Sequence, residues 1–183
     1  MLNRLFAILL IILLTPIFII VGILILFEDG YPIFFKQKRV GVNYTFFNIY
    51  KFRSMKKNTP NVATHLLQNP AQYVLKTGQI LRKLSLDELP NLINIIKGEM
   101  VFVGPRPALY NQDDLMELRI KAGVDQLKPG ITGWAQINGR DEISLEQKVK
   151  FEKEYLLRKS FWFDIKIMVL TFTSVLKSDG VKH

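Results

Sequence analysis

Residues 5–27 form a 23-residue stretch (LFAILLIILLTPIFIIVGILILF) that contains no charged side chain. As an α-helix rising about 1.5 Å per residue, the stretch would be roughly 35 Å long, enough to cross a hydrocarbon core of about 30 Å. A cleaved signal peptide fits poorly, because the stretch is too long for an h-region and residues 27–32 (FEDGYP) offer no small-x-small cleavage site. The sequence therefore predicts a membrane segment in residues 1–27 and a globular domain in residues 28–183.

A proline lies near the middle of this apolar stretch. Pro16 has no N–H to donate to the carbonyl of Ile12, and its ring clashes with that turn, so we expect a bent helix. Two topologies remain open: a kinked helix that spans the membrane, which the length alone favours, and a re-entrant helix that enters and leaves by the same face. Basic residues lie on both sides of the stretch, so the flanking charge does not decide between them.

The remainder of the chain is basic. The whole sequence has 25 Lys and Arg against 16 Asp and Glu, and Arg4 is the only charged residue before position 28, so residues 28–183 carry a net charge of +8. A basic domain beside an apolar helix fits a protein held against an anionic cytoplasmic leaflet. Nucleic-acid binding is the competing explanation of the charge, but it leaves the apolar helix unexplained. The absence of cysteine excludes a thiolate zinc site, and two histidines argue against a multi-histidine metal site.

Hydrophobic periodicity predicts a small β-hairpin and several short helices. Strands are expected at residues 33–36 and 45–52, around a turn at 40–43, and a third short strand at 101–103. Helices are expected at residues 77–83, 88–97, 112–122 and 144–159, with a loop at 56–72 and a glycine-rich loop at 128–140. Residues 161–176 are apolar but contain Asp164 and Lys166, which predicts an interfacial or core-packed helix. The expected fold is α+β and mainly helical, with amphipathic interfacial helices.

Asp87 and Glu88 are the strongest candidates for chemistry. In a purely structural interpretation, Asp87 is the N-cap of the helix at 88–97 and Glu88 is a favourable anion in its first turn. In a functional interpretation, two adjacent carboxylates at a helix start bind a divalent cation, and one of them attacks a phosphorus atom. Both interpretations fit these two residues.

A Pro-Arg-Pro motif presents a second candidate group. Pro105 and Pro107 restrict Arg106 to extended backbone angles, and an arginine on a stiff mount suits bidentate binding of phosphate. Alone, such a motif is more often a surface turn. Only 15 residues separate Glu88 from Gly104, and one helix with an extended return can bring the arginine back to the carboxylates.

The glycine-rich residues 128–140 are the third candidate. Their three glycines, Gly130 among them, allow close backbone approach to a ligand, and Lys128 and Arg140 stand at the two edges. An ordinary loop that turns twice is the alternative. No Walker A, GxGxxG or HExxH pattern occurs in the chain, so P-loop, Rossmann and zincin chemistry are not supported.

In sequence order, these motifs resemble the monotopic phosphoglycosyl transferases, the bacterial sugar transferases that start capsule, O-antigen and N-glycan assembly. The resemblance begins with the N-terminal apolar helix and covers nearly the whole chain. It continues through FFKQKRVG (34–41), FNIYKFRSM (47–55), RKLSLDELPNLINIIKGEM (82–100), VGPRPALYNQ (103–112), KPGITGWAQINGRDEIS (128–144) and DIKI (164–167). Residues 107–112 (PALYNQ) are similar to members that use N-acetylated 6-deoxy amino sugars.

The resemblance implies an activity. Such enzymes move a sugar-1-phosphate from a UDP-sugar to undecaprenyl phosphate and release UMP, with Mg²⁺, at the cytoplasmic face of the bacterial inner membrane. Asp87 matches the nucleophile and Glu88 its dyad partner, and both are expected to hold the metal. The expected substrate-binding residues are Arg82, Pro105, Arg106, Pro107, Gly130 and Arg140. The expected partners are therefore the UDP-sugar, undecaprenyl phosphate and membrane lipid, with no nucleic acid.

The resemblance also implies a topology. The family's membrane helix is re-entrant and broken at a Ser-Pro pair, and this overturns the preference for a spanning helix in residues 1–27. Here the pair is Thr15-Pro16, whose hydroxyl can make the same bond to a helical carbonyl. Residues 28–183 are then the cytoplasmic catalytic domain.

Overall fold

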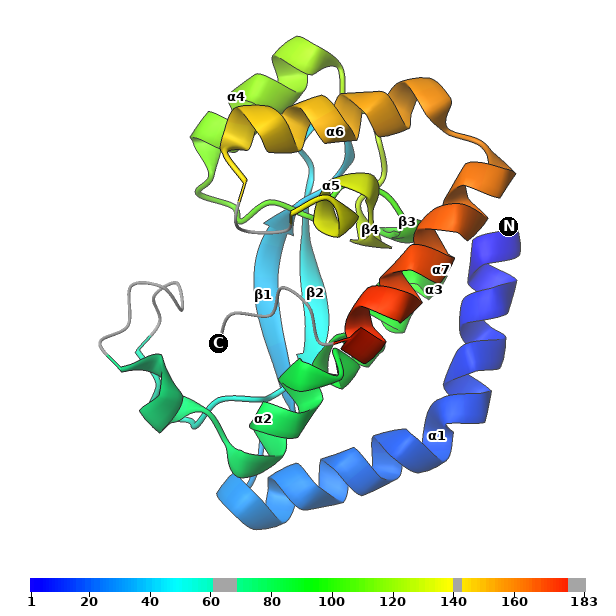
Figure 1. Cartoon of the computed structure of the whole chain (residues 1–183). Helices are drawn as coiled ribbons and strands as arrows, with labels where there is room; N and C mark the ends of the chain where they lie inside the picture. The colour runs from blue at the N-terminus through cyan, green and yellow to red at the C-terminus, as the bar shows by residue number, and fades with distance from the viewer. Residues whose placement is uncertain (61–68, 140–142, 178–183) are drawn as a thin grey trace.

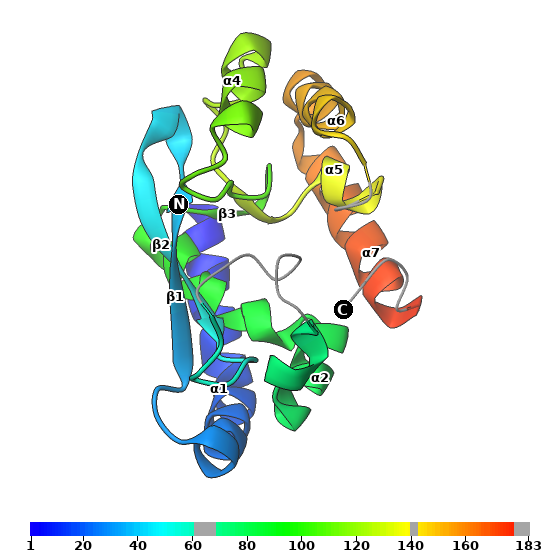
Figure 2. The same cartoon turned by 90° about the vertical axis from the view of Figure 1, so that its left-hand side faces the viewer.

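The structure is a computed structural model that describes residues 1–60, 69–139 and 143–177. It is mainly helical with a small antiparallel hairpin, which confirms the expected α+β class. The hairpin and the N-terminal helix lie on one side of the molecule, and the last two helices lie on the other (Figure 2).

The apolar segment forms helix α1 (Leu2–Asp29), which is bent part-way along its length (Figure 1). Pro16 lies inside this helix, and the Thr15 hydroxyl donates a 2.8 Å hydrogen bond to the carbonyl of Ile11. The predicted bend is confirmed. By length and composition α1 is long enough to cross a membrane, and only 17% of its most apolar 18-residue window is buried.

Both halves of α1 pack against the rest of the chain. Ala7, from the first half, is buried with Ile95, whereas Ile25, from the second half, is buried with Phe52. Near the N-terminus, Arg4 donates to the carbonyl of Lys97 at 3.4 Å. Most of the other apolar side chains of α1 are exposed, among them Leu2, Leu5, Leu9, Ile12, Leu13, Ile19, Ile20 and Phe27.

Strands β1 (Phe34–Val40) and β2 (Phe46–Phe52) form the hairpin, with Phe34 opposite Phe52 and Val40 opposite Phe46. A short 3₁₀ segment, η1 (Val42–Tyr44), connects them. The first strand is longer than predicted, because Lys36 and Lys38 occupy exposed positions of the strand that do not interrupt pairing. Phe47, Ile49 and Phe52 of β2 are buried, so β2 forms the side of the core that faces α1.

The helix predicted at residues 88–97 is divided into two elements. After η3 (Pro70–Tyr73) and α2 (Lys76–Lys83), a 3₁₀ segment η4 (Leu86–Asn91) precedes the α-helix α3 (Leu92–Lys97). Pro90 lies near the junction, and a residue without an N–H cannot continue an α-helical ladder. Gly98 ends α3 in a left-handed conformation (φ 84°), as the sequence predicts.

The glycine-rich residues 128–140 are not a simple loop, contrary to the prediction. They contain strand β4 (Gly130–Thr132), which pairs in parallel with β3 (Val101–Val103), and a short helix α5 (Trp134–Ile137). A side chain on Gly130 would collide with the backbone of Gly104. The close approach that Gly130 allows is therefore between two backbone segments.

Three further helices complete the fold: α4 (Asp113–Ala122), α6 (Leu145–Arg158) and α7 (Phe161–Lys177). Phe163 and Ile167 of α7 are buried with Tyr155 of α6. Phe161, Trp162 and Phe172 lie on the exposed side of α7, at 62, 77 and 66% exposure. The helix is therefore core-packed on one side, as expected.

Candidate active site

The acidic pair lies in the first turn of η4, between α2 and α3. The N-cap is Ser85, in a left-handed conformation (φ 55°) that costs a non-glycine residue roughly 1–2 kcal/mol. Asp87 lies inside the 3₁₀ segment, so its interpretation as an N-cap is wrong. In the described part of the chain, no donor forms a hydrogen bond to the Asp87 carboxylate.

Glu88 is held by two cations from distant parts of the chain. Lys51 of β2 donates to Glu88 Oε1 at 2.6 Å, and Arg106 donates to the same oxygen at 3.0 Å. The predicted return of Arg106 to the carboxylates is therefore confirmed. Burial acts to raise the pKa of Glu88, but the charges and hydrogen bonds of Arg106 and Lys51 outweigh it and hold that pKa far below its usual range. Glu88 stays ionised.

Asp87 has the opposite electrostatic character. Burial raises the pKa of the Asp87 carboxyl above its ordinary value, and the negative charge of Glu88 adds to this effect. The positive charges of Lys51, Arg82 and Arg106 offset part of it. Arg82 is also oriented by a 3.0 Å bond from its Nε to the Ser54 hydroxyl. Asp87 is thus a poorly solvated carboxylate among cations, which is the environment of a nucleophile directed at an anionic substrate.

The backbone of the Pro-Arg-Pro segment is fixed at three successive carbonyls. Gly130 N–H donates to Pro105 O at 2.9 Å, Arg119 donates to Arg106 O at 2.9 Å, and Arg39 donates to Pro107 O at 3.0 Å. The segment is therefore a rigid mount for the Arg106 guanidinium, which is 39% exposed.

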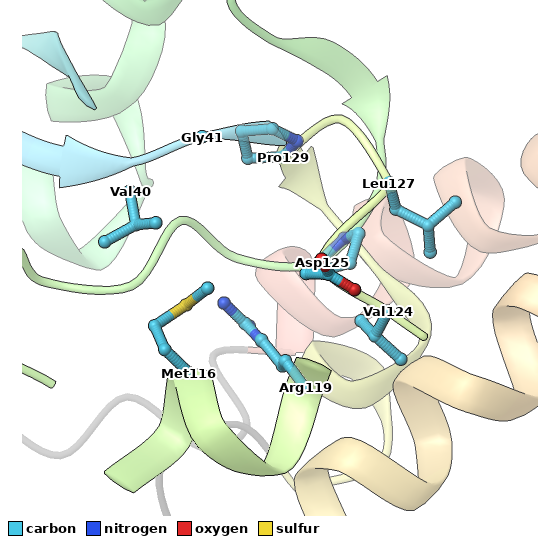
Figure 3. A pocket seen from close by; sticks show the side chains of 9 residues that line it. Val40, Gly41, Met116, Arg119, Val124, Asp125, Leu127 and Pro129 are labelled. Atoms are coloured by element: carbon cyan, nitrogen blue, oxygen red, sulfur yellow. The ribbon is translucent and has the colours of Figure 1, made fainter. Parts of the chain in front are cut away.

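Arg119 is itself held by a buried ion pair. Its Nε donates to Glu152 Oε2 at 2.8 Å, and the two side chains are 6 and 2% exposed. Figure 3 shows the Arg119 side chain extending from α4 between Met116 and Asp125, in the wall of a small pocket. The two helices α4 and α6 thus support the arginine mount through this pair.

An open pocket lies beside Glu88 and Arg106. Pro107 and Gly130, two of the expected substrate-binding residues, also line it, whereas Pro105 lines the neighbouring pocket of Figure 3. Arg140 lies outside the described residues. The other lining residues are Arg39, Ile49, Lys51, Asn91, Met100 and Ile131.

The candidate ligands for the expected Mg²⁺ are the Asp87 and Glu88 carboxylates. In residues 1–60, 69–139 and 143–177, no group of three or more His, Cys, Asp or Glu side chains could enclose an ion. Mg²⁺ is commonly bound by one or two carboxylates together with substrate phosphates. The Asp87 carboxylate, which accepts no hydrogen bond from the described residues, and its neighbour Glu88 fit that shared mode of binding.

Comparison with known proteins identifies the family. The model of the family described as "Bacterial sugar transferase" matches residues 1–178. The chain belongs to this family. The predicted resemblance is confirmed, and this transferase is an enzyme.

Curated relatives agree with this assignment. The exopolysaccharide production protein ExoY of Sinorhizobium fredii is 40% identical, with 97% of this chain and 85% of the relative covered. The uncharacterized sugar transferase EpsL of Bacillus subtilis is 44% identical, with 84 and 75% covered. The UDP-glucose:undecaprenyl-phosphate glucose-1-phosphate transferase of Escherichia coli is 39% identical over 90% of this chain, which spans 37% of that longer relative.

Three residues of the candidate site were not predicted from the sequence. Lys51 follows two buried apolar residues, Phe47 and Ile49, at two-residue spacing, and a lysine on the buried face of a strand is the signal that could have identified it. Arg39 and Asn91 carry no comparable signal, because their place in the pocket depends on tertiary packing.

Proposed function

We propose that the enzyme moves a sugar-1-phosphate from a UDP-sugar to undecaprenyl phosphate, forming undecaprenyl-diphosphate-sugar and UMP through a covalent intermediate on Asp87. The observation that carries this proposal is the dyad: Asp87 accepts no hydrogen bond from the described residues, and its neighbour Glu88 is held by Lys51 and Arg106. The substrate class is supported by relatives whose names specify undecaprenyl phosphate, from Escherichia coli, Komagataeibacter xylinus and Aeromonas hydrophila.

The reaction has two steps, which keep the two anionic substrates apart. An Asp87 carboxylate oxygen attacks the phosphorus next to the sugar, and the bond from that phosphorus to the bridging oxygen breaks, so UMP leaves with the electron pair. A phosphate oxygen of the lipid then attacks the same phosphorus. The bond to Asp87 breaks, and the carboxylate is restored.

The cations of the site balance the charge of these steps. Arg106 is fixed through its carbonyl, and its partly exposed guanidinium faces the pocket, where it stabilises charge that develops on the phosphoryl oxygens. Glu88 keeps Arg106 and Lys51 oriented, because both donate to one of its oxygens. When bound by Asp87 and Glu88 with the substrate phosphates, Mg²⁺ would neutralise part of the diphosphate charge.

We also propose that α1 is re-entrant and that the site works at the cytoplasmic face of the inner membrane. A straight spanning helix would place Met1 roughly 40 Å from the helix end, on the far side of the bilayer. Here, Arg4 and Phe6 contact Lys97 and Phe102 of the globular part, with the two rings 5.3 Å apart. These contacts support a topology in which both ends of α1 lie on the same side of the membrane as the globular part. The exposed aromatic side of α7 supports its interfacial placement. The reaction would be the first membrane step of capsule, O-antigen or glycoprotein glycan assembly.

The test of this function is UMP release by purified protein. UDP-glucose, UDP-galactose, UDP-N-acetylgalactosamine and a UDP-linked N-acetylated 6-deoxy amino sugar would each be supplied with undecaprenyl phosphate and Mg²⁺. We expect UMP from at least one of them, and none from Asp87→Asn at an unchanged Tm. UMP release by Asp87→Asn at the wild-type rate would contradict the role of Asp87.

A further inference from the structure

One buried amide in the pocket has no hydrogen-bond partner in the part of the chain that the structure describes. Asn91 is only 3% exposed, its Oδ1 atom is fully buried, and no hydrogen bond to its side chain is present among the described residues. The large majority of buried side-chain polar atoms in native structures are hydrogen-bonded, and each exception has a cost in stability. Asn91 also lines the pocket that contains Glu88 and Arg106.

Asn94, three residues further along, shows what a structural asparagine looks like in this fold. It is fully buried, and its Oδ1 accepts from Tyr50 N–H at 3.2 Å. Its Nδ2 donates to Asn48 O and to Glu99 Oε2, both at 2.7 Å. Asn94 fastens α3 to β2, whereas Asn91 fastens nothing in the described part of the chain. The difference indicates a ligand for Asn91.

The backbone places Asn91 next to the reacting groups. In a 3₁₀ helix, side chains at i and i+3 eclipse one another, and both Glu88 and Asn91 lie in η4. The Asn91 amide is therefore on the same face as the carboxylate that holds Lys51 and Arg106. Asn91 and Asp87 lie in the same short 3₁₀ segment, four residues apart.

The chemistry of the lining indicates which part of a substrate the amide would bind. The other polar side chains that line the pocket are Arg39, Lys51 and Arg106, which only donate hydrogen bonds, and the ionised Glu88, which only accepts them. Among the described lining residues, Asn91 has the one neutral side chain that both donates and accepts, as a sugar hydroxyl or acetamido group does.

We propose that Asn91 binds the sugar of the sugar-1-phosphate through its side-chain amide. The inference rests on the proposed function and extends it to a substrate-binding residue. A bound sugar would supply the hydrogen bonds that the folded protein leaves unmade.

The test compares Asn91→Ala with Asn94→Ala, using the UDP-sugar that wild-type enzyme turns over fastest. For Asn91→Ala we expect a Tm at least as high as that of wild type, because an unsatisfied buried group is removed beside an open pocket. We also expect a loss of about ten- to a hundred-fold in kcat/KM for UMP release, with inhibition by UMP unchanged. Asn94→Ala should lower Tm by at least about 5 °C, because three hydrogen bonds are lost.

Three results would overturn the inference. The first is unchanged kcat/KM in Asn91→Ala, and the second is a loss of Tm as large as that of Asn94→Ala. The third is inhibition by UMP that weakens as much as kcat/KM, which would place the contact on the nucleotide. A wild-type enzyme that releases no UMP from any UDP-sugar contradicts the proposed function itself, so the two failures are distinguishable.

Discussion

Replacing Lys51 by methionine removes one of the two cations that hold Glu88 and keeps much of the side-chain volume. The Lys51–Glu88 pair is 2.6 Å long, and each side chain is 17% exposed. A hydrogen bond between charged groups at such a site contributes about 1.5–3 kcal/mol. If this is lost from the transition state, the rate of UMP release falls roughly ten- to a hundred-fold at neutral pH.

The same substitution changes the pH dependence. Burial raises the pKa of Asp87, and among the charges that lower it, Lys51 has the largest effect. Without Lys51 the pKa of Asp87 rises further, and a protonated carboxyl is not a nucleophile. Activity is lost as pH falls through this pKa, so the acid limb of the kcat profile should move to higher pH in Lys51→Met.

The assay is the pH profile of UMP release for wild type, Lys51→Met and two controls. Lys51→Arg keeps the charge and should keep the acid limb in place. Lys36→Met removes an exposed cation that lies over the ring of Tyr50, on the neighbouring strand, and should leave both rate and profile unchanged. An acid limb at the same pH in Lys51→Met and wild type would refute the electrostatic coupling of Lys51 to Asp87.

Three further predictions concern the arginine mount and the membrane helix. Arg106→Lys should lower the rate of UMP release about ten- to a thousand-fold at equal folded yield, because an ammonium cannot replace the planar guanidinium; near-normal turnover would reduce Pro-Arg-Pro to a turn. Arg119→Met should cost about 3–5 kcal/mol of unfolding free energy by thermal or denaturant melting, because it leaves the Glu152 charge buried and unpaired, and Arg119→Met with Glu152→Leu should recover most of it. A single cysteine at Asn3 should resist an impermeant external thiol reagent in intact cells and should become reactive when Pro16→Ala straightens α1. Labelling of the cysteine with Pro16 in place would indicate that α1 spans the membrane.

The features that the sequence predicts correctly depend on local geometry. Pro16 lacks an N–H wherever the helix lies, so the bend of α1 could be predicted without any tertiary contact. The return of Arg106 to Glu88 follows from a short spacing, because one short helix and an extended segment leave few arrangements. The helix end at Gly98 has the same local origin.

The features that were missed depend on distant contacts or on competition between two helix types. Lys51 meets Glu88 across 37 positions of sequence, and the parallel pairing of β3 with β4 joins three-residue strands that are too short to show a periodic pattern. Pro90 could start an α-helix or divide it, and only the packing around η4 decides between the two. The different roles of Asn91 and Asn94 likewise follow from what each amide meets in the fold.

The measurement that tests the central claim most directly is the intact mass of the enzyme after incubation with its UDP-sugar and no lipid acceptor. We expect the chain to gain one sugar phosphate, peptide mapping to place it on Asp87, and undecaprenyl phosphate to remove it. Asp87→Asn should gain nothing, because an amide oxygen is a poor nucleophile for phosphorus. An adduct on Glu88 would mean that Glu88 is the nucleophile and Asp87 the supporting carboxylate. UMP release that requires undecaprenyl phosphate, with no adduct at any time, would contradict the two-step mechanism and indicate direct transfer between the substrates.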